Sequence, residues 1–223
     1  MKTPARRRTE LLLGIAAFYV ALWLLWLTPV VFPLRIFVVL LHEISHALAA
    51  LATGGTVERI VLNANEGGAT YVRGGNGFIM LSAGYLGSLL WGLALIEVAG
   101  ARPRRTRIAL GLLAAFIVLV ALLYVRNLFG FLFTAAFGAV LIFAARRLSA
   151  RGVSIVLLTL GLTSALYALL DIRSDILARP HLESDAVMLA RMTGVPAAVW
   201  GVLWIGVALV ACWFGLRRWL RRA

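Results

Sequence analysis

The sequence predicts an all-α polytopic membrane protein with six to seven transmembrane helices and a small β-hairpin between the second and third spans. Hydrophobic residues make up 62% of the 223 residues and charged residues only 14%, and the mean hydropathy is +0.96. Soluble domains are about half apolar and about one quarter charged, so this chain belongs in a lipid bilayer. One helical crossing takes about 20 apolar residues, so the length allows six or seven crossings with short loops. We therefore expect residues 1–223 to form a single membrane-embedded domain.

Seven apolar stretches are candidate spans, and they cover residues 11–32, 34–52, 78–99, 108–125, 128–145, 153–170 and 197–216. Pro29 and Pro33 mark the first junction, because proline removes a helix donor, and Gly54 ends the second helix. The first stretch follows a basic start, as in a signal peptide. It is too long for one and lacks a small-residue cleavage site, so we interpret it as a retained helix.

Residues 56–73 differ from the apolar stretches around them. β-branched residues occur in 56–63 and again in 69–73, and the turn-forming sequence Asn65-Glu66-Gly67-Gly68 lies between these two arms. This pattern predicts a β-hairpin, and the glycines of residues 74–77 predict a flexible exit into the third span. An ordinary polar loop is the alternative interpretation of the same pattern.

The charged residues exclude several kinds of protein. The net charge is +13, but the arginines form short runs beside apolar stretches, which is typical of cytoplasmic membrane flanks and not of a nucleic-acid surface. We expect a multi-pass protein of the cytoplasmic membrane that contacts lipid and binds no nucleic acid. Lys2 is the only lysine, so serine-lysine catalysis is disfavoured, and the single cysteine, Cys212, excludes an internal disulfide or a cysteine-cluster metal site.

The four arginine clusters conflict over the orientation of the first three spans. Each cluster, at residues 6–8, 102–107, 146–151 and 217–222, is expected on the cytoplasmic side. Three predicted crossings separate the first two clusters, and an odd number of crossings cannot return the chain to the same side. Either one early segment only dips into the membrane or one cluster breaks the rule.

The second span contains the sequence His42-Glu43-Ile44-Ser45-His46. Residues four apart stack on one face of a helix, so His42 and His46 can present two imidazole nitrogens to one zinc ion. Glu43 is placed to take a proton from water whose pKa zinc lowers to about 7. Ionisable groups within a membrane each cost about 2.5 to 3.5 kcal/mol, so we favour a metal site over histidines that only hydrogen-bond to neighbouring helices.

A third ligand must come from elsewhere in the chain. Asp171 closes the sixth apolar stretch, and Asp175 lies one helical turn further on the same face. We expect one of them, Asp171 first and Asp175 as the alternative, to complete a Zn2+ site, although both could instead cap the helix or pair with arginines. His181 is a less favoured substitute. Asn127, at the junction of two spans, could orient a substrate carbonyl or simply cap a helix.

These residues resemble the site-2 protease family of intramembrane zinc metalloproteases, and especially its compact, almost wholly membrane-embedded branch. The resemblance rests on the His42 to His46 motif, on the glycine-containing segment 82–88 that follows a hairpin, and on the pair Leu170-Asp171. It implies that His42, His46 and Asp171 bind zinc and that Glu43 is the catalytic base. The sequence departs from the family pattern at Tyr85, Ser88 and Ile172.

We therefore expect residues 1–223 to form a metalloprotease-like domain. Its expected activity is that of a zinc metalloendopeptidase that cleaves transmembrane or juxtamembrane segments of membrane-protein substrates by zinc-activated water. The alternative is a non-proteolytic zinc-binding membrane scaffold or chaperone, which the departures at Ser88 and Ile172 favour. A metal transporter fits less well, because the intramembrane polar residues gather at one place and do not follow a path. The sequence does not indicate an oligomeric state.

Overall fold

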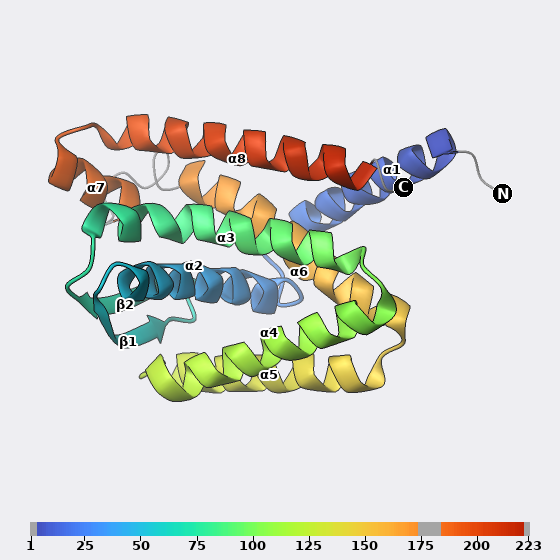
Figure 1. Ribbon diagram of the computed structural model, residues 1–223, viewed down its shortest axis with the longest axis horizontal. Helices are drawn as coiled ribbons and strands as arrows, with labels where there is room; N and C mark the ends of the chain where they lie inside the picture. Colours follow the sequence, from blue (N-terminus) through green and yellow to red (C-terminus); the bar gives the residue numbers. More distant parts are fainter. Residues whose placement is uncertain (1–3, 174–183, 221–223) are drawn as a thin grey trace.

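The computed structural model describes residues 4–173 and 184–220, and it confirms the predicted fold class (Figure 1). Within these residues the chain forms eight helices and one two-stranded sheet. Six helices are long and apolar enough to cross a membrane, namely α2 (Phe32–Ala52), α3 (Gly77–Ala99), α4 (Pro103–Tyr124), α5 (Leu128–Arg147), α6 (Ala150–Arg173) and α8 (Ala197–Leu220). The other two helices are α1 (Pro4–Leu24) and the short α7 (Asp185–Thr193).

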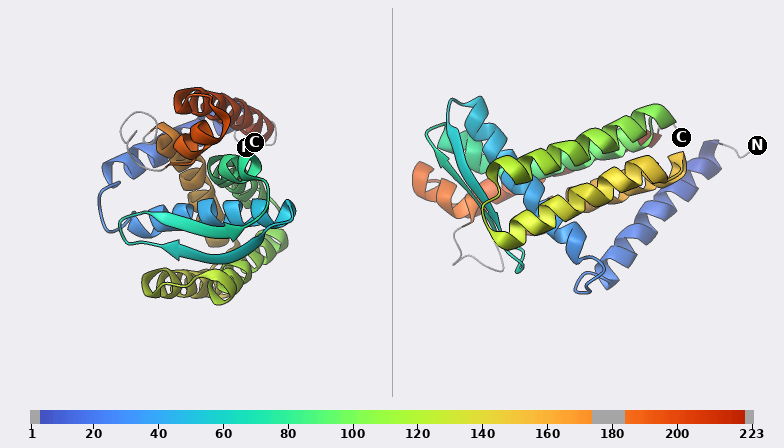
Figure 2. Two further views of the ribbon diagram at one scale, coloured as in Figure 1. Left: turned by 90° about the vertical axis from the view of Figure 1, so that its left-hand side faces the viewer. Right: turned by 90° about the horizontal axis from the view of Figure 1, so that it is seen from below.

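Helix α2 forms the centre of the bundle and is the most buried of the six candidate spans. It is surrounded by α3, by the α4–α5 pair and by α6 (Figures 1 and 2). The side chain of Phe37 stacks on Phe137 of α5 with ring centroids 5.1 Å apart, and Leu40, Leu41 and Ile44 are almost fully buried. A central helix that neighbours cover on most sides can carry polar side chains that lipid would not tolerate.

The predicted hairpin is present. Strands β1 (Thr56–Leu62) and β2 (Gly68–Arg73) pair antiparallel, and the turn between them contains Glu66 with a positive φ of 66°. The hairpin runs beside α2 at one end of the bundle (Figure 2, left). Its outer strand β1 is secured to the α4–α5 junction, where the backbone N–H of Arg126 donates to the carbonyl of Ile60 at 3.1 Å. The opposite edge, that of β2, has no neighbouring strand among the described residues.

The helix that corresponds to the first predicted span, residues 11–32, begins and ends earlier in the chain than predicted. Helix α1 ends at Leu24, and residues 25–31 form turns that contain Pro29 before α2 begins at Phe32. Helices α1 and α2 meet at an angle, and together they run once from one end of the molecule to the other (Figures 1 and 2). The prediction placed a full crossing in each of the first two stretches. In the structure, α1 and α2 together make one traverse of the molecule, and the proline-containing turn lies between them.

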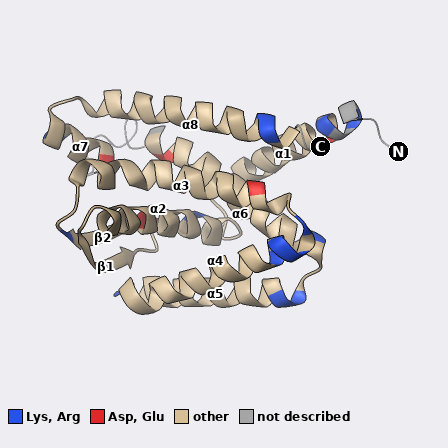
Figure 3. Cartoon of the chain, viewed as in Figure 1, with Lys and Arg blue, Asp and Glu red and all other residues tan. Residues whose placement is uncertain are grey.

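This arrangement brings the arginine clusters to one end of the molecule (Figure 3). Arg8 of α1 donates to the carbonyl of Leu220 at the end of α8, and Arg218 of α8 forms an ion pair with Glu97 at the end of α3. Arg107 at the start of α4 donates to the carbonyl of Ala145 near the end of α5. This arrangement favours the first of the two alternatives for the arginine clusters, an early segment that does not make a separate crossing.

Helix α7 was not among the predicted elements, because its nine residues are too few for a membrane span. The Ser184 side chain caps this helix by accepting a hydrogen bond from the backbone N–H of Val187, and Gly194 ends it in the left-handed conformation with a φ of 75°. Both are ordinary helix signals. The helix lies at the hairpin end of the bundle, away from the four arginine clusters (Figures 1 and 3).

Candidate metal centre

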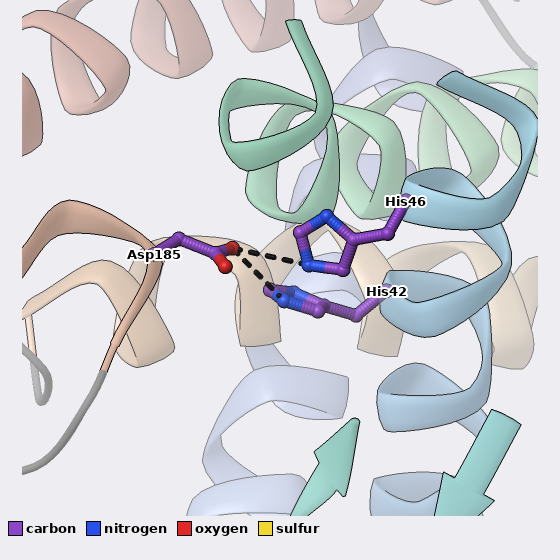
Figure 4. A group of neighbouring side chains, drawn as sticks. All are labelled: His42, His46 and Asp185. Atoms are coloured by element: carbon purple, nitrogen blue, oxygen red, sulfur yellow. Dashed lines mark ion pairs between the residues drawn. The ribbon is translucent and has the colours of Figure 1, made fainter. Parts of the chain in front are cut away.

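The two histidines of the α2 motif lie one turn apart on the same face, as their spacing predicts (Figure 4). Their ring centroids are 4.6 Å apart and the rings are nearly perpendicular, at 78°. The side chains of His42 and His46 are mostly buried, with 16% and 13% of their surface exposed. Two imidazoles held this way can offer one nitrogen each to a common ion.

The third member of the group is Asp185, the first residue of α7. Its Oδ2 atom lies 3.1 Å from Nε2 of His42 and 3.3 Å from Nε2 of His46 (Figure 4). Among the described residues, these three are the group of potential ligands whose donor atoms all lie within 4.8 Å of one another. The Ser184 cap begins α7 at this point and so places the Asp185 carboxylate against the histidines.

Of the two aspartates that the sequence favoured, only Asp171 lies among the described residues. Asp171 is on the wall of the same cavity but outside the group of three, so Asp185 is the aspartate that contacts both imidazoles. Asp175 and His181, the other candidates, fall outside the described residues. Asp185 itself carried one usable signal, because a Ser-Asp pair is a common helix start. That signal predicts a helix, but it does not say what the aspartate faces.

The hydrogen bonding of His46 fits a metal ligand. Its Nδ1 lies 2.7 Å from the backbone carbonyl of Met80 on α3, and a carbonyl can only accept, so Nδ1 carries the hydrogen. In a neutral imidazole Nε2 is then left with its lone pair pointing at the Asp185 carboxylate. A metal-binding histidine usually donates its other ring N–H to a partner such as a backbone carbonyl, which fixes the tautomer of the ring.

The spacing and burial of the group also fit a zinc ion. Neighbouring ligand atoms of a tetrahedral zinc site with bonds of about 2.0 Å are about 3.3 Å apart, which matches the two distances to Oδ2. The Oδ2 atom is buried and has no well-aligned hydrogen-bond donor among the described residues. A lone pair and a carboxylate oxygen that face each other in a buried place repel each other unless a cation binds to both, so the residues present fit the metal.

The electrostatics of Asp185 depend on the same neighbours. Burial by itself would raise the pKa of its carboxyl, but the imidazoles of His46 and His42, when they are protonated, outweigh that effect and hold the pKa below its usual value. The carboxylate is therefore charged over the whole physiological range, which is the form a metal requires.

The glycine-containing segment of α3 allows the group to assemble. A Cβ atom at Gly84 would lie 2.5 Å from Nε2 of His42 and 2.6 Å from Oδ2 of Asp185, so no larger residue fits there. Tyr85, where the resembled family usually has proline, packs edge-on against the His42 ring with centroids 5.0 Å apart. It also contacts Trp204 of α8, at 5.1 Å between centroids. The segment therefore forms one wall of the site.

Glu43 lines the same cavity, which has a volume of about 590 Å³ and is bounded by α2, the hairpin, α3 and α7. Only 5% of Glu43 is exposed. Its Oε2 accepts a hydrogen bond of 2.7 Å from the hydroxyl of Thr70 on β2. A carboxylate beside two imidazoles and a third ligand is the arrangement that a general base for water needs.

Asn127 lies away from this cavity wall and is engaged with the hairpin. Its Oδ1 accepts from the backbone N–H of Leu62 at 3.1 Å, and its Nδ2 donates to the Leu62 carbonyl at 2.6 Å. The side chain thus pairs with β1 as a neighbouring strand would. Its observed contacts secure the hairpin, and contact with a substrate stays a prediction.

The fold and the site together define a polytopic membrane protein with a histidine–glutamate–histidine motif, a buried aspartate beside it and a cavity that these residues line. A family model described as Peptidase M50B-like matches residues 15–215, so the chain belongs to this family, the site-2 protease family of membrane metalloproteases. The comparisons with curated proteins and with solved structures gave no match.

Proposed function

We propose that this protein is an intramembrane zinc endopeptidase that cleaves transmembrane or juxtamembrane segments of other membrane proteins in the cytoplasmic membrane. The observation that carries the proposal is the meeting of His42, His46 and Asp185 within one cavity that Glu43 also lines. The family membership supports the reaction class. The three potential ligands come from α2 and α7, and the base comes from α2.

Each residue has a distinct part in the proposed reaction. His42, His46 and Asp185 would hold Zn2+, which lowers the pKa of water and polarises a carbonyl when it is bound. Glu43 accepts the proton from the attacking water and returns it to the leaving amine, because its carboxylate lines the cavity beside the ligands. The cavity gives water and an unwound peptide a place within a bundle that is otherwise apolar.

The edge of β2 would bind the substrate backbone. Five consecutive residues at this edge line the cavity, Gly68, Ala69, Thr70, Tyr71 and Val72. The outer edge of β1 is used by the α4–α5 junction, whereas β2 has no further partner strand among the described residues. An extended substrate segment could therefore pair with β2, and strand pairing would expose its peptide bonds to the site.

The test compares the wild type with Glu43→Gln after purification in detergent. We expect both forms to bind zinc equally, because Glu43 is not a ligand, and we expect cleavage of co-expressed single-span substrates to fall at least about 100-fold in the variant. Glu58→Gln is the matched control, since Glu58 is exposed on β1 and pairs with Arg73. Equal cleavage by wild type and Glu43→Gln would contradict the proposal.

A non-proteolytic zinc scaffold is the second candidate. Ile172 is 1% exposed and packs in one cluster with Tyr85 and Trp204. Two of the residues that depart from the family pattern, Tyr85 and Ile172, are therefore packing residues beside the site. This function predicts zinc binding and co-purification of a membrane partner without cleavage by the wild type. Zinc uptake into vesicles that Glu43→Gln leaves unchanged would instead favour transport.

A further inference from the structure

Thr70 of β2 contacts the glutamate of the α2 motif twice. Its hydroxyl lies 2.7 Å from Oε2 of Glu43 and 2.9 Å from the backbone carbonyl oxygen of the same residue. A threonine hydroxyl has one hydrogen, so the carboxylate and the carbonyl share a single donor. A bond to a charged carboxylate is the stronger of the two, and it fixes where Oε2 points.

Gly68 leaves the space that the other oxygen of the same carboxylate occupies. A Cβ atom at this position would lie 2.4 Å from Oε1 of Glu43 and 2.8 Å from its Cδ. The carboxylate therefore lies directly against the backbone of β2 at Gly68 and against the hydroxyl at Thr70. Two residues of one strand thus lie against the two oxygens of the Glu43 head group.

We propose that Thr70 is a positioning residue that orients the Glu43 carboxylate toward the metal centre, so that the hairpin forms part of the catalytic apparatus as well as a surface for substrate. This inference rests on the proposed peptidase function. A general base must be held in its productive geometry, and a misplacement of about 1 Å can cost about 100-fold in rate.

The hairpin does not need the Thr70 hydroxyl to stay in place. Its turn is anchored by an ion pair between Glu66 and the buried Arg35 of α2, and the Arg35 guanidinium also lies 5.7 Å from the ring centre of Trp26. Its outer strand is held by Asn127 at Leu62. With both sides secured, loss of one hydroxyl should free the carboxylate and leave the strand where it is.

The experiment compares Thr70→Val, which keeps the shape and β-preference of the side chain but removes the hydroxyl, with Thr70→Ser, which keeps the hydroxyl. Thr56→Val is the matched control, because the Thr56 hydroxyl also bonds within the hairpin, to the carbonyl of Arg73, and is far from Glu43 in the hairpin register. Zinc content, kcat and KM are measured for each. We expect kcat to fall about 10- to 100-fold in Thr70→Val with KM and zinc unchanged. Thr70→Ser should restore most of kcat, and Thr56→Val should match the wild type.

A second readout does not require turnover. Infrared spectra of protein with isotope-labelled glutamate, taken as differences against Glu43→Gln, isolate the Glu43 carboxylate band. We expect that band to shift in Thr70→Val and to return in Thr70→Ser. No shift in Thr70→Val, or a shift with undiminished kcat while Glu43→Gln is inactive, would overturn the positioning role. A Glu43→Gln variant as active as the wild type would instead refute the peptidase function on which this role depends.

Discussion

Asp185 is the residue on which the candidate metal centre depends for its negative charge. We expect Asp185→Asn to weaken zinc binding by about 100-fold or more, because loss of a ligand should exceed the 10- to 100-fold cost of disturbing a residue that merely supports one. The affinity is measured by competition with a chelator of known strength. Asp171→Asn is the comparison, since Asp171 lines the cavity without belonging to the group of three. Loss of zinc in Asp171→Asn together with normal binding in Asp185→Asn would return the ligand role to Asp171.

The two kinds of ligand differ in how far the sequence can predict them. His42 and His46 are related by the helical repeat, so their common face follows from local geometry alone. Asp185 approaches them only because α7 packs at the end of α3, and that contact is a property of the whole fold. The contact between Thr70 and Glu43 could not be predicted for the same reason, since nothing in the sequence of a strand indicates which helix residue a threonine will contact. Local spacing thus predicts the pair of histidines, whereas tertiary packing determines which residue lies beside them as the third candidate ligand.

At the scale of single elements, the predictions succeed where strong local signals agree. The hairpin combines β-branched arms with a glycine-containing turn, and both strands form within a residue or so of the expected positions. The first span was predicted to end too late in the chain, because apolar composition alone does not reveal the turns at residues 25–31. Helix α7 was missed, although Ser184 and Gly194 mark its two ends, because a nine-residue helix lacks the length that identifies a span.

The crossing of α3 and α6 depends on two glycines. A Cβ atom at Gly92 would lie 2.7 Å from the backbone nitrogen of Ala165 and 2.8 Å from the carbonyl oxygen of Gly161. We expect Gly92→Ala to destabilise the protein by about 1 to 3 kcal/mol, because rigid backbone atoms leave no space for the added carbon. The change should lower the melting temperature in detergent, and loss of zinc on heating should follow the same shift.

Gly206 provides the control for that substitution. It lies in α8, and no atom lies within 4 Å of where its Cβ would be, so Gly206→Ala adds a methyl group in open space. Its expected effect is neutral or slightly stabilising, since alanine is the better helix former. A Gly92→Ala protein as stable as Gly206→Ala would show that the two helices can separate at no cost.

In the whole molecule, the arginine clusters and the candidate metal centre lie toward opposite ends, which no single element shows. The four arginine clusters lie at one end, and the hairpin, α7 and the candidate metal centre lie toward the other (Figures 1 and 3). The positive-inside rule then assigns the arginine end to the cytoplasm. Because α1 and α2 share one traverse, six traverses separate the two ends of the chain, and both ends return to the same side. The entrance to the cavity would therefore face away from the cytoplasm.

This arrangement can be tested with single cysteines in a Cys212→Ser background. Thr9 lies near the start of α1, Ser149 is exposed between α5 and α6, and Ala64 is exposed in the hairpin turn. We expect a membrane-impermeant thiol reagent to label Thr9→Cys and Ser149→Cys in inverted vesicles, because both positions lie at the arginine end, and Ala64→Cys in right-side-out vesicles. Retained zinc binding in each variant serves as the control for folding. Labelling of Thr9→Cys from the same side as Ala64→Cys would mean that α1 makes a crossing of its own, and the orientation conflict would then have to be resolved by an arginine cluster outside the cytoplasm.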